Sequence, residues 1–234
     1  MNVFWLPEKG VDFPNPELAD AEGLLAIGGD LSVERLISAY ACGIFPWYNE
    51  ESPILWWSPD PRFVLYPDNL HIPRSLRKVI NSRRFTITMD RAFDQVIRFC
   101  ACSPRPDQCG TWIVPQMIKA YCELHLHGIA HSVEAWRDGV LVGGMYGVSL
   151  GGVFFGESMF YREPDASKVA LVWLVRFLRQ SGFSMLDCQQ VTHNLRRFGG
   201  EEVRRNDFLA QLKKALRTPT RQGLWEIPED FFPL

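Results

Sequence analysis

The feature that most limits the fold is a stretch of residues, 131–160, with three strand-like runs joined by Asp-Gly and Gly-Gly. These dipeptides are typical of tight β-hairpin turns, because they adopt the backbone conformations that such turns need. Three consecutive strands joined in this way form an antiparallel meander. We therefore expect a mostly antiparallel sheet.

Helical patterns surround this meander. Residues 168–180 confine their polar side chains to one narrow stripe, so this helix is expected to be buried on most of its circumference. A strand over 184–189 follows it. The other expected helices cover 32–42, 73–82, 90–100 (with Asp90 as its cap), 115–127 and 206–217, and 84–90 alternates like a strand. The pattern predicts an α+β fold in which helices cover a mostly antiparallel sheet.

Composition narrows the setting in which the chain works. The 234 residues are 47% hydrophobic, which is enough for a substantial core. The longest apolar run, VALVWLV, is too short to span a bilayer, and no basic segment followed by an apolar one indicates a signal peptide. Six cysteines without such a signal indicate reduced thiols. We expect a cytoplasmic monomer with no membrane partner.

Charge is divided along the chain, although the net charge is only −2. Residues 1–60 hold ten acids and two bases, whereas residues 71–84 hold five Lys or Arg and no acid. Residues 196–221 hold eight Lys or Arg against three acids. Such a chain could meet an anionic partner with one surface and a cationic partner with another, although ordinary solvated surface remains the alternative.

The strand SMLDCQ holds the first candidate for chemistry. Alternation along a strand places Asp187 and Gln189 on one face, roughly 7 Å apart, while Leu186 and Cys188 point the other way. A carboxylate and an amide so placed could orient and deprotonate an amine. A solvent-facing strand surface is the structural alternative.

Metal and nucleotide chemistry find little support in the sequence. Cys100, Cys102 and Cys109 include no C-x-x-C pair, and no spaced pair of histidines accompanies them, so no zinc site is expected. No Gly-rich phosphate loop of the G-x-G-x-x-G or G-K-[ST] type occurs. We expect no metal and no dissociable cofactor.

Tryptophans are concentrated in rigid, Gly- and Pro-rich contexts. Trp47, Trp56, Trp57 and Trp112 lie in FPWY, LWWSPDP and GTWI. Packing is the usual role of Trp, but an aromatic ring on a rigid loop can also stack on a nucleobase. The basic segment 71–84 lies close in sequence, which favours stacking for at least one of them.

Several blocks together resemble one family. GLLAIGGDLSVERLISAYACGIFPWY, PILWWSPDPR, GTWI, LVGGMYGV, FGESMF, ASKVAL and LDCQ occur in the order typical of the bacterial leucyl/phenylalanyl-tRNA–protein transferases. The resemblance implies a small N-terminal domain, 1–62, before a domain, 63–234, with a fold like that of the GNAT acetyltransferases. The chain lacks the Q/R-x-x-G-x-G/A loop that holds acetyl-CoA, which fits an aminoacyl-tRNA donor.

The implied reaction transfers Leu or Phe, and less readily Met, from charged tRNA to the α-amine of proteins that begin with Arg or Lys. Such a tag marks proteins for degradation through the N-degron route. After LDCQ the family often has a pattern close to S-L-G-A, whereas this chain has Arg197-Phe198-Gly199-Gly200. This difference affects the expected geometry of acceptor binding.

Residue roles follow from the resemblance and from the patterns above. Gln189 would accept a hydrogen bond from the attacking amine, and Asp187 would orient that amide and stabilise the positive charge on nitrogen. Trp47 and Trp112 would stack on the terminal adenosine of tRNA. The aminoacyl pocket and acceptor site would use Met145, Glu157, Met159, Leu171 and Leu186, and the tRNA backbone would contact Arg74, Arg77, Lys78, Arg83 and Arg84.

Two other functions remain open at this point. A GNAT-like N-acetyltransferase would use acetyl-CoA, and the missing pyrophosphate loop argues against it. A tRNA-binding protein without catalysis would not need the polar pair of Asp187 and Gln189.

Overall fold

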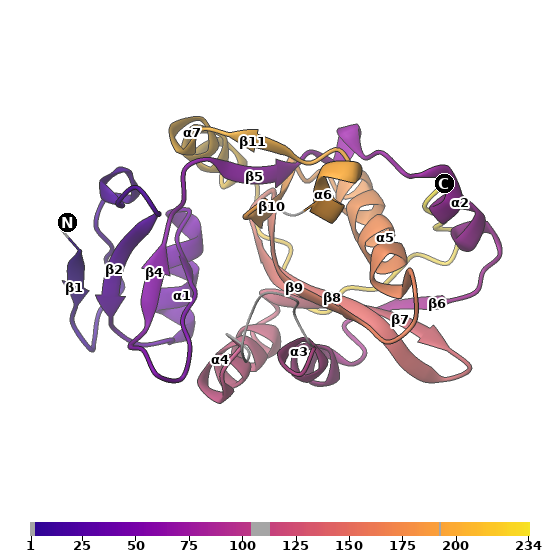
Figure 1. The fold of residues 1–234 in the computed structure, drawn as a ribbon, viewed down its shortest axis with the longest axis horizontal. Helices are drawn as coiled ribbons and strands as arrows, with labels where there is room; N and C mark the ends of the chain where they lie inside the picture. The colour runs from indigo at the N-terminus through magenta and orange to yellow at the C-terminus, as the bar shows by residue number, and fades with distance from the viewer. Residues whose placement is uncertain (1–2, 104–112, 192) are drawn as a thin grey trace.

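The computed structural model describes residues 3–103, 113–191 and 193–234 (Figure 1). The N-terminal part forms a four-stranded sheet in the order β1-β2-β4-β3. Helix α1 (Val33–Ala41) is capped by the Ser32 hydroxyl, which accepts a hydrogen bond from the backbone N–H of Arg35. It contacts both helix α4 (Pro115–Leu126) and strand β8 (Val140–Leu150), which belong to the larger part of the chain. The strands are β1 (Phe4–Leu6), β2 (Leu24–Gly28), β3 (Phe45–Pro46) and β4 (Leu55–Trp57), with a short 3-10 helix, η1 (Pro16–Leu18).

The second sheet has seven strands in the order β11-β5-β10-β9-β8-β7-β6. Its neighbours are antiparallel except β9 and β10, which run parallel. The expected meander is β7-β8-β9, and the expected strand 184–189 is β10 near the middle of the sheet. The strands are β5 (Arg62–Leu65), β6 (Thr86–Met89), β7 (Ala130–Arg137), β8 (Val140–Leu150), β9 (Val153–Tyr161), β10 (Met185–Gln189) and β11 (Glu201–Val203).

Helices cover both faces of this sheet, which confirms the α+β class (Figure 1). α3 (Phe93–Ala101) and α4 (Pro115–Leu126) lie on one face, and α5 (Ala166–Gln180) lies on the other. α5 is buried along most of its surface, as its narrow polar stripe predicts. The remaining helices are α2 (Arg74–Asn81), which packs on α5, η2 (Pro67–Asn69), α6 (His193–Arg197) and α7 (Arg205–Ala215).

One expected helix start is wrong. Asp90 does not cap α3, because Ala92 occupies the cap position. The Asp90 carboxylate instead accepts hydrogen bonds from the backbone N–H groups of Ser132 (2.8 Å) and Trp225 (2.7 Å). It therefore ties β7 to the C-terminal segment, a long-range role that local sequence does not reveal.

Two apolar cores lie on the two sides of the seven-stranded sheet. One joins the sheet to α3, α4 and the N-terminal part of the chain, and the other joins it to α2 and α5. Across the described ranges, no helix has the length and apolar character needed to cross a membrane.

Candidate active site

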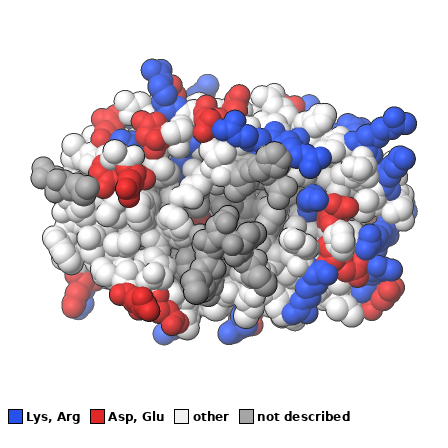
Figure 2. All heavy atoms as spheres, viewed as in Figure 1, with Lys and Arg blue, Asp and Glu red and all other residues white. Residues whose placement is uncertain are grey.

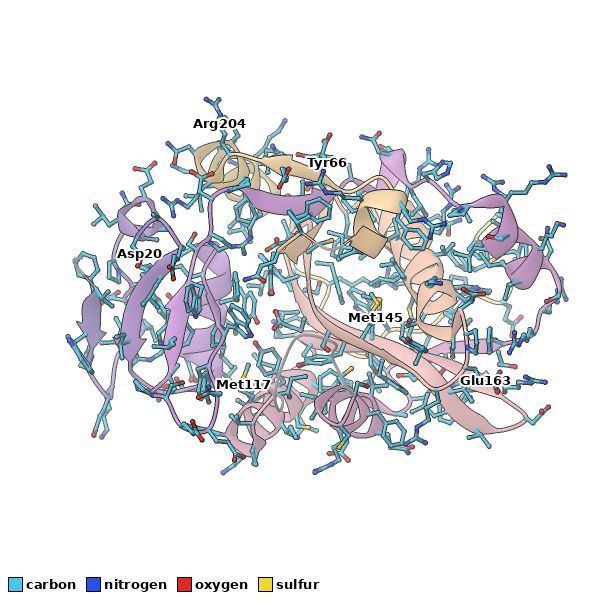
Figure 3. The ribbon with its side chains drawn as sticks, viewed as in Figure 1. Asp20, Tyr66, Met117, Met145, Glu163 and Arg204 are labelled. Atoms are coloured by element: carbon cyan, nitrogen blue, oxygen red, sulfur yellow. The ribbon has the colours of Figure 1, made fainter. Side chains whose placement is uncertain are left out.

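A cavity of about 780 Å³ opens between the middle of the seven-stranded sheet and α5. Met145 points from β8 into the space between the sheet and α5 (Figure 3). All residues expected in the aminoacyl pocket line this cavity, namely Met145, Glu157, Met159, Leu171 and Leu186. The fold thus brings together side chains from β8, β9, β10 and α5.

An irregularity in β9 explains how a glutamate comes to lie in this apolar setting. Gly156 pairs with Gly147 of β8 and Ser158 pairs with Tyr146, so Glu157 is an extra residue without a partner across the ladder. Such a bulge re-aims the side chains around it. Phe155 before the bulge packs in the core on the α3–α4 side, whereas Met159 after it packs on the α5 side.

Three hydrogen-bond donors converge on the buried carboxylate of Glu157. The Tyr40 hydroxyl donates to Oε1 (2.7 Å), and the Tyr121 hydroxyl donates to Oε2 (3.2 Å). The side-chain amide of Gln189 donates to Oε1 through Nε2 (2.7 Å). The two tyrosine hydroxyl oxygens also contact each other, and because each hydroxyl carries a single proton, both can donate to Glu157 only when neither donates to the other. Helices α1 and α4 and strand β10 therefore meet at one carboxylate.

Burial sets the charge behaviour of this cluster. It raises the pKa of Glu157 to about 7, with a smaller contribution from the negative charge of Asp187 and opposition from the three hydrogen bonds. Burial, followed by the negative charge of Glu157, raises the pKa of both Tyr40 and Tyr121 well above the ordinary value. The tyrosines are therefore neutral donors, while Glu157 exchanges a proton near neutral pH.

Asp187 is fully buried and paired with Arg62. The guanidinium donates to both carboxylate oxygens, from Nε to Oδ1 (2.9 Å) and from Nη2 to Oδ2 (2.7 Å). Oδ1 also accepts the backbone N–H of Gln189 (2.8 Å). Asp187 thus holds the backbone of Gln189, and the side-chain amide of Gln189 is oriented by Glu157 instead.

Strand β10 alternates as expected up to Cys188, since Leu186 and Cys188 pack in the same core, but it is irregular at Gln189. The pairing of β10 with β5 shifts register between Asp187 and Gln189, and Gln189 has a left-handed backbone with φ of 62°. On the other side of the strand, Leu186 and Cys188 both line the cavity.

Of the two tryptophans expected to stack on the adenosine, Trp47 is not among the residues that line the cavity. Trp47 is half-buried and packs edge-to-face on Trp57, with ring centroids 5.7 Å apart. Its backbone carbonyl accepts a hydrogen bond from the Trp57 indole N–H (2.7 Å). Trp112 and Cys109 lie outside the described residues.

The expected tRNA-backbone residues are all exposed on α2 and the turn that follows it. In Figure 2, Lys and Arg gather on the side where Figure 1 draws α2. Arg84 pairs with Glu163 (2.7 Å), and Arg77 donates to the carbonyl of Ile72 (3.3 Å). Burial and then the charges of Arg179 and Arg77 lower the pKa of Arg176, so α5 extends this positive surface. The full expected set is Arg74, Arg77, Lys78, Arg83 and Arg84.

The sequence patterns did not identify Tyr40, Tyr121 or Arg62 as site residues. Tyr40 and Arg62 lie inside the quoted family blocks, but nothing local distinguishes them from core residues. Tyr121 lies on a helix without a motif. Only the three-dimensional fold brings them to Glu157 and Asp187. Within the described part of the chain, no group of three or more His, Cys, Asp or Glu could hold a metal ion.

Known proteins match the chain along its length. The family model for leucyl/phenylalanyl-tRNA protein transferase matches residues 64–213, and the model for the N-terminal domain of that family matches residues 29–60. A leucyl/phenylalanyl-tRNA–protein transferase of Oleidesulfovibrio alaskensis is 60% identical over 239 aligned residues, covering 100% of this chain and 96% of the relative. One from Nitratidesulfovibrio vulgaris is 56% identical and covers 100% of both chains.

Solved structures show more distant likenesses. L-PGS from Bacillus licheniformis has a TM-score of 0.39 and 14% identity, over 69% of this chain and 50% of the other. A GCN5-related N-acetyltransferase from Kribbella flavida has a TM-score of 0.34 and 13% identity, over 70% and 58%. Likenesses at this level are too weak to decide anything further about the chain.

The family models and the curated relatives agree on one class, so the chain is an aminoacyltransferase. It belongs to the leucyl/phenylalanyl-tRNA–protein transferase family, with a small N-terminal domain ahead of the larger one.

Proposed function

We propose that this chain transfers Leu or Phe, and less readily Met, from aminoacyl-tRNA to the α-amine of proteins that begin with Arg or Lys. The product carries a new N-terminal residue that marks the protein for N-degron degradation. The observation that carries the proposal is the apolar cavity bordered by Glu157, whose carboxylate is bonded to Gln189.

The cavity suits the side chain of the donor amino acid. Two thioethers, Met145 and Met159, lie in its lining together with Leu171 and Leu186. Unbranched thioethers adapt to guests of different shape, so Leu, Phe and Met can all be accepted. One methylene in an apolar pocket changes selectivity by only roughly 10–200-fold, which supports graded selectivity.

The reaction is the aminolysis of an ester. The α-amine of the acceptor attacks the ester carbonyl carbon, a C–N bond forms, and the bond to the ribose 3′ oxygen breaks. Nitrogen loses a proton and the ribose oxygen gains one. Because the ester is already activated, the enzyme mainly supplies positioning and charge placement. An ordinary α-amine, with a pKa of roughly 7.7–8.0, is partly neutral at neutral pH.

Gln189 is the group that we assign to the attacking amine. Its Nε2 donates to Glu157, which fixes the orientation of the amide. The amide carbonyl oxygen then accepts a hydrogen bond from the amine as attack proceeds. Asp187 does not contact the amine in this proposal. It accepts the backbone N–H of Gln189 and so holds the backbone of that residue.

Glu157 is the carboxylate that we assign to the cationic acceptor. Asp187 is already neutralised by Arg62, so it offers no free charge to a second cation. Glu157 lines the cavity, and the two hydroxyls and one amide that donate to it are all neutral. The acidic N-terminal residues would add long-range attraction for an N-terminal Arg or Lys.

The tRNA body is assigned to the basic surface, and its terminal adenosine to Trp47 and Trp112. Exposure of all five residues on and after α2 supports the first assignment.

We further infer a domain boundary at 62/63 and a cytoplasmic monomer. The four-stranded sheet ends at Trp57 and the seven-stranded sheet begins at Arg62, so the change from one sheet to the other falls within the five residues that precede that boundary.

The test uses labelled leucyl-tRNA with peptides that begin with Arg, Lys or Ala, and with an Arg peptide whose α-amine is acetylated. We expect label in the Arg and Lys peptides and little in the other two. A parallel reaction replaces leucyl-tRNA with labelled acetyl-CoA. Label that entered the peptide only from acetyl-CoA, or from neither donor, would overturn the proposed function.

A further inference from the structure

Arg62 occupies a completely buried position at the start of β5. Besides its two bonds to Asp187, it donates through Nη1 to the backbone carbonyl of Gly43 (3.1 Å). Gly43 follows α1 in the N-terminal part of the chain, and Asp187 lies in the middle of the seven-stranded sheet. One guanidinium therefore joins the two parts of the molecule.

Aromatic rings lie against this guanidinium. Its central carbon lies 4.8 Å from the ring centroid of Phe45 in β3 and 4.6 Å from that of Phe208 in α7. A planar guanidinium suits this setting, because it stacks on rings and still presents parallel donors to a carboxylate. A lysine ammonium cannot reproduce the bidentate bond or the stacking.

The interactions continue from Arg62 to the reacting amide. Asp187 accepts the backbone N–H of Gln189, which has a left-handed backbone that is uncommon for a residue other than glycine. Such a conformation persists only where the surrounding structure holds it. With its backbone held this way, Gln189 directs its side chain to Glu157.

We propose that Arg62 is a positioning residue for aminoacyl transfer, which fixes Asp187 and through it the conformation of Gln189. The inference rests on the proposed role of Gln189 in the reaction. It also gives the N-terminal part of the chain a direct influence on the reacting amide, through Gly43 and Phe45.

The test compares Arg62→Lys with Arg35→Lys, both in the full chain. Arg35 is the matched control, because it is also fully buried but pairs with Asp30 in the N-terminal part. Transfer from leucyl-tRNA to an Arg-starting peptide gives kcat at saturating substrates, and filter binding gives the Kd for leucyl-tRNA. We expect Arg62→Lys to lower kcat at least tenfold with Kd unchanged within twofold, and Arg35→Lys to keep kcat within threefold.

A double-mutant cycle shows whether Arg62 acts through Asp187. The variant with both Arg62→Lys and Asp187→Asn should be no slower than the slower single variant, because both changes break the same link. A double variant in which the two single effects multiply would mean that Arg62 acts independently and would overturn the inference. Thermal melts of each variant correct kcat for the folded fraction.

The variant Gln189→Ala distinguishes the role of Gln189 in the reaction from the positioning role of Arg62. If it loses turnover while Arg62→Lys keeps normal kcat, Arg62 has no positioning role, and the role of Gln189 stands. If Gln189→Ala itself keeps normal turnover, the role of Gln189 and that of Arg62 fail together.

Discussion

Glu157 is a carboxylate that the fold buries among neutral donors, which changes when it carries charge. An ordinary glutamate is ionised throughout the physiological range, whereas burial raises the pKa of Glu157 to about 7. Both charge states are therefore populated near neutral pH. The ionised form suits a cationic acceptor, so binding and protonation are linked at this residue.

This linkage predicts how stability changes with pH. The pKa of Glu157 is about 7 in the folded chain against an ordinary value of 4.5, so its contribution to stability is complete below pH 4.5 and is lost as pH rises through 7. The free energy of unfolding of the wild type should fall relative to that of Glu157→Gln by roughly 2.5 kcal/mol between pH 5 and pH 8. Urea denaturation at both pH values measures this difference.

The difference in the free energy of unfolding between the wild type and Glu157→Gln cancels the contributions of the other titrating groups. Parallel pH dependence of the wild type and Glu157→Gln would show that Glu157 ionises normally.

At the residue scale, the sequence predicted which residues line the cavity, but it did not predict the hydrogen bonds and ion pairs that they form. The five pocket residues proposed from the family blocks all line one cavity. Their prediction needed only the matching of sequence blocks to the family. The sequence did not predict that Asp187 is bonded to Arg62, 125 positions away. An interaction over that separation depends on packing of the whole chain.

At the scale of elements, two irregularities shape the site. The bulge in β9 inserts Glu157 as an extra residue, so that Phe155 and Met159 pack on opposite sides of the sheet, and the pairing of β10 with β5 shifts register between Asp187 and Gln189. Periodicity predicted the meander, the buried helix and the position of most helices, because these depend on repeating patterns. It could not predict the two irregularities, which break the repeat.

The cavity formed by these elements predicts donor selectivity. Met159→Phe should fill part of it and lower transfer of Phe relative to Leu by roughly tenfold or more, since the larger guest loses space first. The ratio of kcat/KM for phenylalanyl- and leucyl-tRNA measures the effect. Met89→Phe is the control, because Met89 is buried in the same core but is not in the cavity lining. An unchanged ratio in Met159→Phe would place the donor side chain elsewhere.

At the scale of the whole molecule, charge is divided in space as well as in sequence. Acidic side chains lie mainly over the N-terminal sheet in Figure 2, and basic side chains lie mainly over the end that carries α2. The distribution of charge along the sequence left this division open beside ordinary solvated surface, and only the fold shows that α5 adds Arg176 and Arg179 to the basic end. A polyanionic donor and a cationic acceptor would then approach different parts of one molecule.

The basic end predicts salt-dependent donor binding. Arg74→Glu with Lys78→Glu should weaken binding of leucyl- and phenylalanyl-tRNA alike and flatten the dependence of log K on log salt by roughly 0.7–0.9 for each phosphate that is no longer neutralised. Lys213→Glu with Lys214→Glu makes the same charge change on exposed residues of α7 and serves as the control. Equal salt slopes for the wild type and the α2 variant would show that this surface does not bind tRNA.

The most direct measurement is single-turnover transfer from prebound leucyl-tRNA to an Arg-starting peptide by Gln189→Ala. Removing one preorganised hydrogen-bonding group from an active site typically costs roughly 10²–10³-fold, so we expect that loss in rate with an unchanged Kd for leucyl-tRNA. Gln190→Ala, at the exposed neighbouring position, should keep the wild-type rate. A Gln189→Ala enzyme that transferred Leu at the wild-type rate would contradict the proposed site.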